Sequence, residues 1–330
     1  MRRAAVLRSV VRYIKSIIFC QNRASMLRPI AQLFMFLLLG QVSLAESSKE
    51  THASHPDTLS IELTAFNNIV VHAVLNEKDT LRLMLHTGVS EISLTEEATA
   101  RLTIITFGDV DTVESWGGES ESRYSSNNHI QMGDFHWDHV PIWESKHSSP
   151  TTDGKFGINL FEGKIVELDF EHEYMVIHSS LPKAIDAYDE LALVSEHGLI
   201  FLEGICLIKG EAYPNRFLVH TGYSGSILLD DVFVETHRIG EHLEVIKESV
   251  LKDSYGNELK TIHAILPAFQ LNETQFIDVP IGFFQGSINR QKISVIGGNM
   301  LKRFNIIFDL GEEKIYLKQN ALFGLPFSSN

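Results

Sequence analysis

Two histidines in a repeated tripeptide carry the main chemical signal of this sequence. His-Thr-Gly occurs at residues 86–88, after the apolar run Leu-Arg-Leu-Met-Leu, and again at residues 220–222, after Arg-Phe-Leu-Val. A neutral imidazole can accept a proton near pH 7, and it can also bind a metal such as zinc. Whether His86 and His220 act together depends on the elements that position them.

The sequence around the tripeptides is also repeated, which separates a duplication from a chance match. Residues 130–132 and 140–142 (Ile-Gln-Met and Val-Pro-Ile) recur as Phe-Gln-Leu and Val-Pro-Ile at 269–271 and 279–281. Residues 156–160 recur in the same order as 296–300, and the offset between copies rises only from 134 to 140 residues along the chain. The sequence therefore predicts two homologous lobes of about 120 residues each, close to the usual size of a domain.

Most of the predicted elements are short strands. They are rich in β-branched or aromatic residues and bounded by Asn, Asp, Gly or Lys, for example at 69–75 and 314–318. Helical patterns are confined to residues 95–101, 183–193 and 230–237. The predicted fold class is all-β, with two lobes and few short helices.

The N-terminal segment has the features of an export signal. Residues 1–45 contain seven Lys and Arg and no acid, and the apolar stretch 29–40 is short for a bilayer span and is followed by the small-x-small pattern Ser-Leu-Ala. We therefore expect a periplasmic or secreted protein; a retained membrane anchor is the alternative, and translation could start at Met1 or at Met26. The predicted order is a signal peptide with a basic N-terminal extension (1–45), a flexible lead-in (46–58), an N-terminal lobe (59–180), a linker (181–199) and a C-terminal lobe (200–330).

The acidic balance of the chain limits its partners. The chain has 28 basic and 42 acidic residues, a formal charge of −14, and removal of the seven basic residues of the signal leaves 21 against 42. Such a surface repels nucleic acid and anionic lipid, so we expect no nucleic acid and, after signal cleavage, no membrane as partner. Cys206 is then the single cysteine, so no intramolecular disulfide can form, and its apolar neighbours indicate a buried, inert thiol. We expect a monomer.

The order of the repeated elements resembles a known peptidase clan. An apolar strand that ends in x-Thr-Gly, then a hairpin, then an apolar-Gly strand before a short helix occurs twice, which is similar to the pepsin and retropepsin clan of aspartic peptidases. The resemblance covers about residues 59–317. It implies a two-lobed all-β acid-protease fold in which each lobe supplies an Asp-Thr-Gly turn and two aspartates meet at the lobe interface. In this sequence His86 and His220 stand where the resemblance places those aspartates.

The resemblance also implies roles for neighbouring residues. The threonines would hydrogen bond across to the opposite turn, and the glycines would let two backbones approach closely. These supporting residues are Thr87, Gly88, Thr221 and Gly222. The hairpin at Trp116, Gly117 and Gly118 resembles the flap that closes over bound peptide; an ordinary surface loop is the alternative.

Replacement of two acids by two imidazoles changes the expected chemistry. Aspartic peptidases need two adjacent carboxyl groups that share one proton, whereas two histidines both tend to protonate and repel below about pH 6.5 and are neutral above it. Acid-protease activity by the usual mechanism is therefore expected to be absent or very low. A pseudopeptidase is the first function that fits, one that has no cofactor and binds an extended peptide, an unfolded protein or a partner protein between its lobes.

Two other functions remain open. The protein could be a hydrolase in which His86 and His220 bind zinc or activate water directly, although a catalytic zinc normally has three protein ligands and Glu91 is the nearest acid. It could also be an interaction domain whose cleft is filled and whose histidines are hydrogen-bonded core residues. A separate cluster, His136-Trp-Asp-His139, is predicted to lie at the surface, because two histidines at i, i+3 supply too few ligands for a metal.

Overall fold

The computed structural model describes residues 57–115, 118–252, 254, 256, 258–284 and 291–328. The predicted signal peptide, nearly all of the predicted lead-in, and Trp116 and Gly117 of the predicted flap lie outside the described residues. Within the described part of the chain, no helix is long and apolar enough to cross a membrane.

The first half of the described chain is mostly strand, as predicted. Its single α-helix begins after Thr95, whose hydroxyl accepts a hydrogen bond from the backbone N–H of Ala98, so the predicted helix start is confirmed. The elements are β1 (Asp57–Leu63), β2 (Ile69–Leu75), β3 (Asp79–Leu85), β4 (Ile92–Thr95), α2 (Glu96–Arg101), β5 (Asp109–Ser115), β6 (Gly118–Met132), β7 (Phe135–Ser145), β8 (Gly154–Phe156), the 3₁₀ helix η1 (Ile158–Phe161), β9 (Ile165–Asp169) and β10 (Tyr174–His178).

The second half repeats this pattern. Asp230 caps the predicted helix at 230–237 by accepting from the backbone N–H of Phe233. The elements are η2 (Lys183–Ala187), β11 (Asp189–Ala192), β12 (Val194–Glu196), β13 (Leu199–Ile208), β14 (Glu211–His220), β15 (Ile227–Leu228), α3 (Asp231–Thr236), α4 (Ile239–His242), β16 (Val245–Lys252), β17 (Glu258–Leu271), β18 (Thr274–Phe284), β19 (Ser294–Gly297), α5 (Gly298–Leu301), β20 (Phe304–Asp309) and β21 (Lys314–Gln319).

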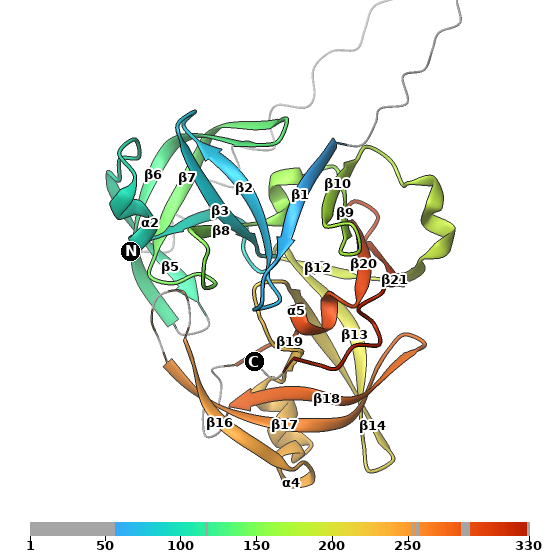
Figure 1. The fold of residues 1–330 in the computed structure, drawn as a ribbon. Helices are drawn as coiled ribbons and strands as arrows, with labels where there is room; N and C mark the ends of the chain where they lie inside the picture. The colour runs from blue at the N-terminus through green and yellow to red at the C-terminus, as the bar shows by residue number, and fades with distance from the viewer. Residues whose placement is uncertain are drawn as a thin grey trace, which may run out of the picture. The chain divides into compact units, whose positions relative to one another are not determined.

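The two halves have the same strand order. Hydrogen-bonded neighbours run β2-β3-β8-β4-β7-β6-β5 in the N-terminal lobe and β13-β14-β19-β15-β18-β17-β16 in the C-terminal lobe (Figure 1). In each lobe the strand that carries the His-Thr-Gly turn pairs in parallel with a short strand late in the lobe, through Leu85 with Phe156 and through Val219 with Ile296. This equivalence confirms the predicted duplication and the two-lobed all-β architecture.

Six further strands, which come from both halves of the chain, extend the sheet of the N-terminal lobe, whereas the strands of the C-terminal lobe form a separate sheet with β12. The order of the six strands is β11-β21-β20-β9-β10-β1, and the central pair consists of β9 from the first half and β20 from the second, with Leu168 opposite Ile306 (Figure 1). The helix predicted over 183–193 is wrong in its second half, because residues 189–192 form β11 and pair with β21. This tertiary pairing overrides the local helical preference of the segment.

The core fills the interior of both lobes and reaches the strands that carry the turns. Leu83, Leu85, Phe217 and Val219, which lead into the two tripeptides, are fully buried. Cys206 on β13 is also fully buried, and burial raises the pKa of its thiol to about 12. The predicted inert thiol is therefore confirmed, since the reactive thiolate does not form near neutral pH.

Candidate functional site

The two tripeptides form matching turns at the ends of β3 and β14. In the first turn the backbone N–H of His86 donates to the carbonyl of Phe156 on β8, and His220 lies opposite Gly297 on β19 in the same parallel pairing. Each histidine carbonyl then accepts a hydrogen bond from the residue three positions on, Val89 or Tyr223. The two side chains are thus projected from equivalent backbone positions.

The threonines of the turns hold the lobes together. The hydroxyl of Thr87 donates to the carbonyl of Val219, and the hydroxyl of Thr221 donates to the carbonyl of Leu85 at 2.7 Å. Each hydroxyl oxygen also accepts from the backbone N–H of the opposite threonine, at 3.1 Å in both directions. Both side chains are buried, so the four hydrogen bonds form a closed network that excludes solvent.

The glycines of the turns leave room for the imidazole rings. A Cβ at Gly222 would lie 2.2 Å from Cδ2 of His86, and a Cβ at Gly88 would lie 3.1 Å from Cδ2 of His220. Real Cβ atoms do not approach other atoms as closely as the first distance, whereas the second is merely tight. Gly222 is therefore required by the ring of His86, and Gly88 is less constrained.

The structure brings the two predicted site histidines together. The ring centroids of His86 and His220 are 4.4 Å apart, and the planes meet at 65°, edge to face. Nδ1 of His86 lies 3.2 Å from the backbone N–H of Gly88 and accepts its hydrogen bond, which leaves Nε2 as the protonated nitrogen of the neutral ring. Nδ1 of His220 is buried and has no hydrogen-bond partner among the residues that the structure describes.

His86 is buried and His220 is half-buried, and the desolvation of both rings favours their neutral forms. Desolvation lowers the pKa of His86 well below its usual value, and positive charge on His220 or Lys155 would lower it further. Desolvation also lowers the pKa of His220 to about 4, with a smaller contribution from Lys155. Among the described residues, no carboxylate contributes to the shift of either pKa. At neutral pH the site is therefore a pair of uncharged rings, and no acid of the described chain shares a proton with them.

No set of metal ligands is completed around the pair. Among the residues that the structure describes, no three His, Cys, Asp or Glu side chains converge on one point. Glu91, the acid closest in sequence, is exposed and accepts a hydrogen bond from Ser90 instead. The two histidines thus lack the third protein ligand of a catalytic zinc site.

Comparisons with known proteins identify the fold. No protein-family model and no curated protein sequence matches this chain. Among solved structures, it is similar to the aspartic proteinase from Irpex lacteus, with a TM-score of 0.56 and 10% sequence identity over 83% of this chain and 100% of that chain. The fold is pepsin-like. At this identity the likeness concerns the fold alone.

Three polar residues beside the pepsin-like turns were not found by sequence reasoning. The side-chain amide of Asn68 donates to the carbonyl of Thr221 at 2.9 Å, and that of Asn67 donates to the carbonyl of Ser224 at 2.9 Å. Lys155 on β8 is buried next to the histidines, and its Nζ donates to the hydroxyl of Ser254 from the opposite lobe at 2.6 Å. Of these three residues, only Asn67 could have been noticed in the sequence, because it has a positive φ and asparagine is common at such turn positions.

Gly118, the described residue of the predicted flap, begins β6 of the hairpin of β5 and β6. Ser115 and Gly118 are the last paired residues of this hairpin, and β5 is the outermost strand of its sheet in the described chain. The described part of the flap is thus an edge hairpin of the N-terminal lobe.

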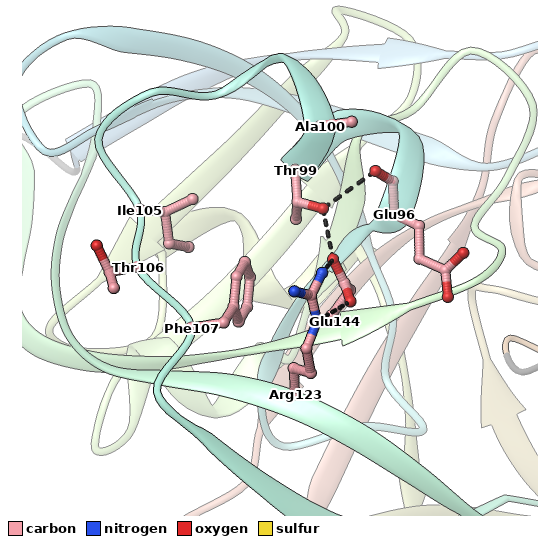
Figure 2. A pocket seen from close by; sticks show the side chains of 8 residues that line it. All are labelled: Glu96, Thr99, Ala100, Ile105, Thr106, Phe107, Arg123 and Glu144. Atoms are coloured by element: carbon pink, nitrogen blue, oxygen red, sulfur yellow. Dashed lines mark hydrogen bonds and ion pairs between the residues drawn. The ribbon is translucent and has the colours of Figure 1, made fainter.

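A cavity beside this hairpin is separate from the histidines. It has a volume of about 540 Å³ and lies between α2, the segment that precedes β5, and the strands β6 and β7. Arg123 and the buried Glu144 face each other across it, with hydrogen bonds of 2.7 and 2.8 Å, and Phe107 lies under the guanidinium (Figure 2). Thr99 donates to the same carboxylate. Arg123 and Glu144 are therefore paired with each other, and the exposed Glu96 is the third charged residue of the lining.

A second cavity, of about 650 Å³, lies in the C-terminal lobe between β17, β18 and the segment at 323–328. Neither His86 nor His220 lines either cavity. The histidine pair lies instead at the two turns, where the rings pack against Gly88 and Gly222.

Proposed function

We propose that this protein is a pseudopeptidase of pepsin-like fold, which binds an extended peptide or a partner protein between its lobes without cleaving it. In this proposal His86 and His220 occupy the positions at which peptidases of this fold carry their catalytic aspartates. The observation that carries the proposal is a pair of neutral imidazoles, with His86 buried and His220 half-buried, held on an intact Thr-Gly framework.

The charge state of the pair argues against acid-protease chemistry. The family mechanism uses one carboxylate as base and one carboxylic acid as acid, which share a proton because both cannot ionise at once. Two imidazoles with lowered pKa values are both neutral at pH 7 and both become cationic in strong acid. No pH therefore provides the pair with the single shared proton and net negative charge that the mechanism needs.

The framework around the pair supports a retained binding role. The four hydrogen bonds of Thr87 and Thr221 still join the lobes. The edge strands β5 and β16 end the two sheets in the described chain, so each offers backbone groups to which an extended peptide can add by strand pairing. The acidic surface favours a peptide or protein partner over nucleic acid.

A hydrolase that uses a histidine as base is the second candidate. The buried Nδ1 of His220 has no hydrogen-bond partner among the described residues, and a neutral imidazole nitrogen can accept a proton from water. A zinc enzyme has less support, because the described residues supply only two ligands at this site.

The proposed setting is outside the cytoplasm. The basic and apolar segment at residues 1–40, followed by the small residues at 43–45, supports export to a periplasm or secretion of a monomer. Amino-terminal sequencing of the protein recovered from the exported fraction tests this part, and an intact N-terminus would contradict it.

The central experiment compares the wild type with the H86D/H220D and H86N/H220N variants. Fluorescently labelled, unfolded casein reports binding by polarisation and cleavage by release of quenching, from pH 3 to pH 8, with and without a chelator. We expect the wild type and the Asn variant to bind without cleavage. We expect the Asp variant to cleave in acid and to be inhibited by a peptide that mimics the tetrahedral transition state.

Cleavage by the wild type would contradict the proposal, and the Asn variant and the chelator would then distinguish the other two mechanisms. Loss of that cleavage in H86N/H220N alone would indicate a histidine base, and loss upon chelation would indicate a metal enzyme. Absence of casein binding in all three proteins, with native unfolding transitions, would contradict the retained binding role.

A further inference from the structure

A second histidine cluster lies on the outward face of the hairpin of β6 and β7. His129 on β6 lies beside His136 and Asp138 on β7, and the side chains of His136 and Asp138 are exposed. Nδ1 of His129 is 2.8 Å from Oδ1 of Asp138, and Nε2 of His129 is 3.5 Å from Nδ1 of His136. Pairing of the two strands thus adds His129, which is absent from the sequence cluster at 136–139.

The carboxylate determines which nitrogen of His129 is available. An ionised aspartate can only accept a hydrogen bond, so Nδ1 of His129, which lies 2.8 Å from Oδ1 of Asp138, carries the proton. Nε2 of His129 then accepts the hydrogen bond from Nδ1 of His136, and an ion bound by both nitrogens takes the place of this proton. A carboxylate that holds the far nitrogen of a ligating histidine is a recurrent feature of metal sites.

The spacing of the two facing nitrogens suits a metal ion. Two imidazole nitrogens at 2.0–2.1 Å from a tetrahedral ion lie about 3.4 Å apart. The corresponding separation between His129 and His136 is 3.5 Å, and the ring centroids are 5.5 Å apart. An ion can therefore bind between the rings with little movement of either side chain.

The opposite face of the hairpin holds the cluster in place. Trp137 points inward between His136 and Asp138, packs edge to face on Phe161 at 5.4 Å, and donates from Nε1 to the carbonyl of Leu160 at 3.0 Å. Ile130, next to His129, is fully buried. Both ligand-bearing strands are thus fixed by core contacts, which lowers the entropic cost of positioning the imidazoles.

We propose that His129 and His136 form a two-imidazole site for a divalent late first-row metal ion, with Asp138 as the residue that orients His129. Imidazole ligands suit Cu²⁺, Ni²⁺ and Zn²⁺, and the order of affinities places Cu²⁺ first. No third His, Cys, Asp or Glu converges with them among the described residues, so the remaining coordination positions face solvent and hold water. The site is independent of the histidine pair at the turns.

The test measures binding of Cu²⁺ and Zn²⁺ to the full-length protein without an affinity tag, by calorimetry at pH 7.5. We expect one metal ion per protein to bind more tightly than any further ion. The His129→Ala and His136→Ala variants should each lower the affinity for this ion at least tenfold. Asp138→Asn should weaken it about 10- to 100-fold, as substitution of outer-shell carboxylates does elsewhere. His139→Ala is the matched control, because His139 is exposed on the same strand but bonds Asn127 instead.

Paramagnetic resonance of the Cu²⁺ protein supplies a second readout. We expect hyperfine splitting from two nitrogens in the wild type and the His139→Ala variant, and from fewer in the His136→Ala variant. Equal affinity and equal spectra in the wild type and the His129→Ala and His136→Ala variants would overturn the proposal. Unfolding curves of each variant exclude a general loss of structure as the cause.

Discussion

The turn at residues 86–88 and the turn at residues 220–222 use their threonines in the same way and their histidines in different ways. Each threonine hydroxyl donates to a carbonyl of the opposite lobe and accepts from the opposite threonine N–H. Nδ1 of His86 has a backbone partner, whereas Nδ1 of His220 has none in the described part of the chain. The threonine hydrogen bonds are therefore symmetric between the two turns, whereas the hydrogen bonds of the two histidines are not.

This difference separates structure from chemistry in the site. The hydrogen bonds of Thr87 to the C-terminal lobe and those of Thr221 to the N-terminal lobe are equivalent. Both sets satisfy buried backbone groups, so both turns need their threonine. The rings instead depend on their surroundings, which differ because β8 places Lys155 near the pair while the equivalent position of β19 is Val295. The predictions below test how far the two-fold equivalence extends.

Substitution of either threonine by valine should have the largest effect. Thr87→Val leaves the carbonyl of Val219 and the N–H of Thr221 buried without their partner, and each such group costs about 1–3 kcal/mol. We expect a loss of about 4 kcal/mol in the free energy of unfolding, measured in urea, and a similar loss for Thr221→Val. Thr87→Ser keeps the hydroxyl and is the control. A large effect of only one valine would break the equivalence of the turns.

Acidification should destabilise the protein through the histidines. The pKa of His220 is about 4 in the folded protein and about 6.5 in the unfolded chain, so the unfolded state binds the extra proton between these values. The contribution of His220 to the free energy of unfolding is complete above pH 6.5. It decreases as the pH falls, and about 3 kcal/mol has been lost at pH 4. Urea unfolding of wild type and His220→Asn at pH 7, 5 and 4 measures it.

The His86→Asn variant extends the same measurement to the other turn. Burial also lowers the pKa of His86, so His86→Asn should likewise reduce the acid sensitivity of the protein. Equal curves for wild type and both variants would show that neither ring is buried in its neutral form.

The two glycines should respond unequally to an added methyl group. In Gly222→Ala the new Cβ meets the ring of His86, which is held by Gly88, and overpacking of this kind costs about 2 kcal/mol. Gly88→Ala has only tight contacts and should cost less than about 1 kcal/mol. The double variant Gly222→Ala/His86→Ala should recover much of the loss. Equal costs of the two single substitutions in urea unfolding would contradict this asymmetry.

Removal of Lys155 should have the smallest effect on the pair. Its charge lowers the pKa of both His86 and His220, so Lys155→Met should raise both values, which NMR titration of the two imidazoles would detect. Lys183→Met, at an exposed lysine, is the control. No change in either histidine upon loss of Lys155 would contradict this electrostatic coupling.

Several features of the fold could be predicted because they are repeated. The apolar segments that lead into the tripeptides recur with small changes in spacing, and the structure places them on equivalent strands, such as β8 and β19. The helix at 183–193 was predicted in part wrongly, because local preference cannot reveal that residues 189–192 pair with β21. Asn68 and Lys155 escaped notice for the same reason, since their partners at Thr221 and Ser254 lie in the other lobe.

The sequence by itself determined that two equivalent turns exist, that each carries Thr-Gly, and that histidines occupy the position before them. Strand patterns and the duplicated order of elements are local properties of the sequence, so they can be recognised without knowing which distant residues are in contact. Only the tertiary structure decided that His86 and His220 meet, that desolvation lowers the pKa of both rings, and that His129 faces His136. These properties depend on distances between residues far apart in the chain and on the desolvation that packing imposes.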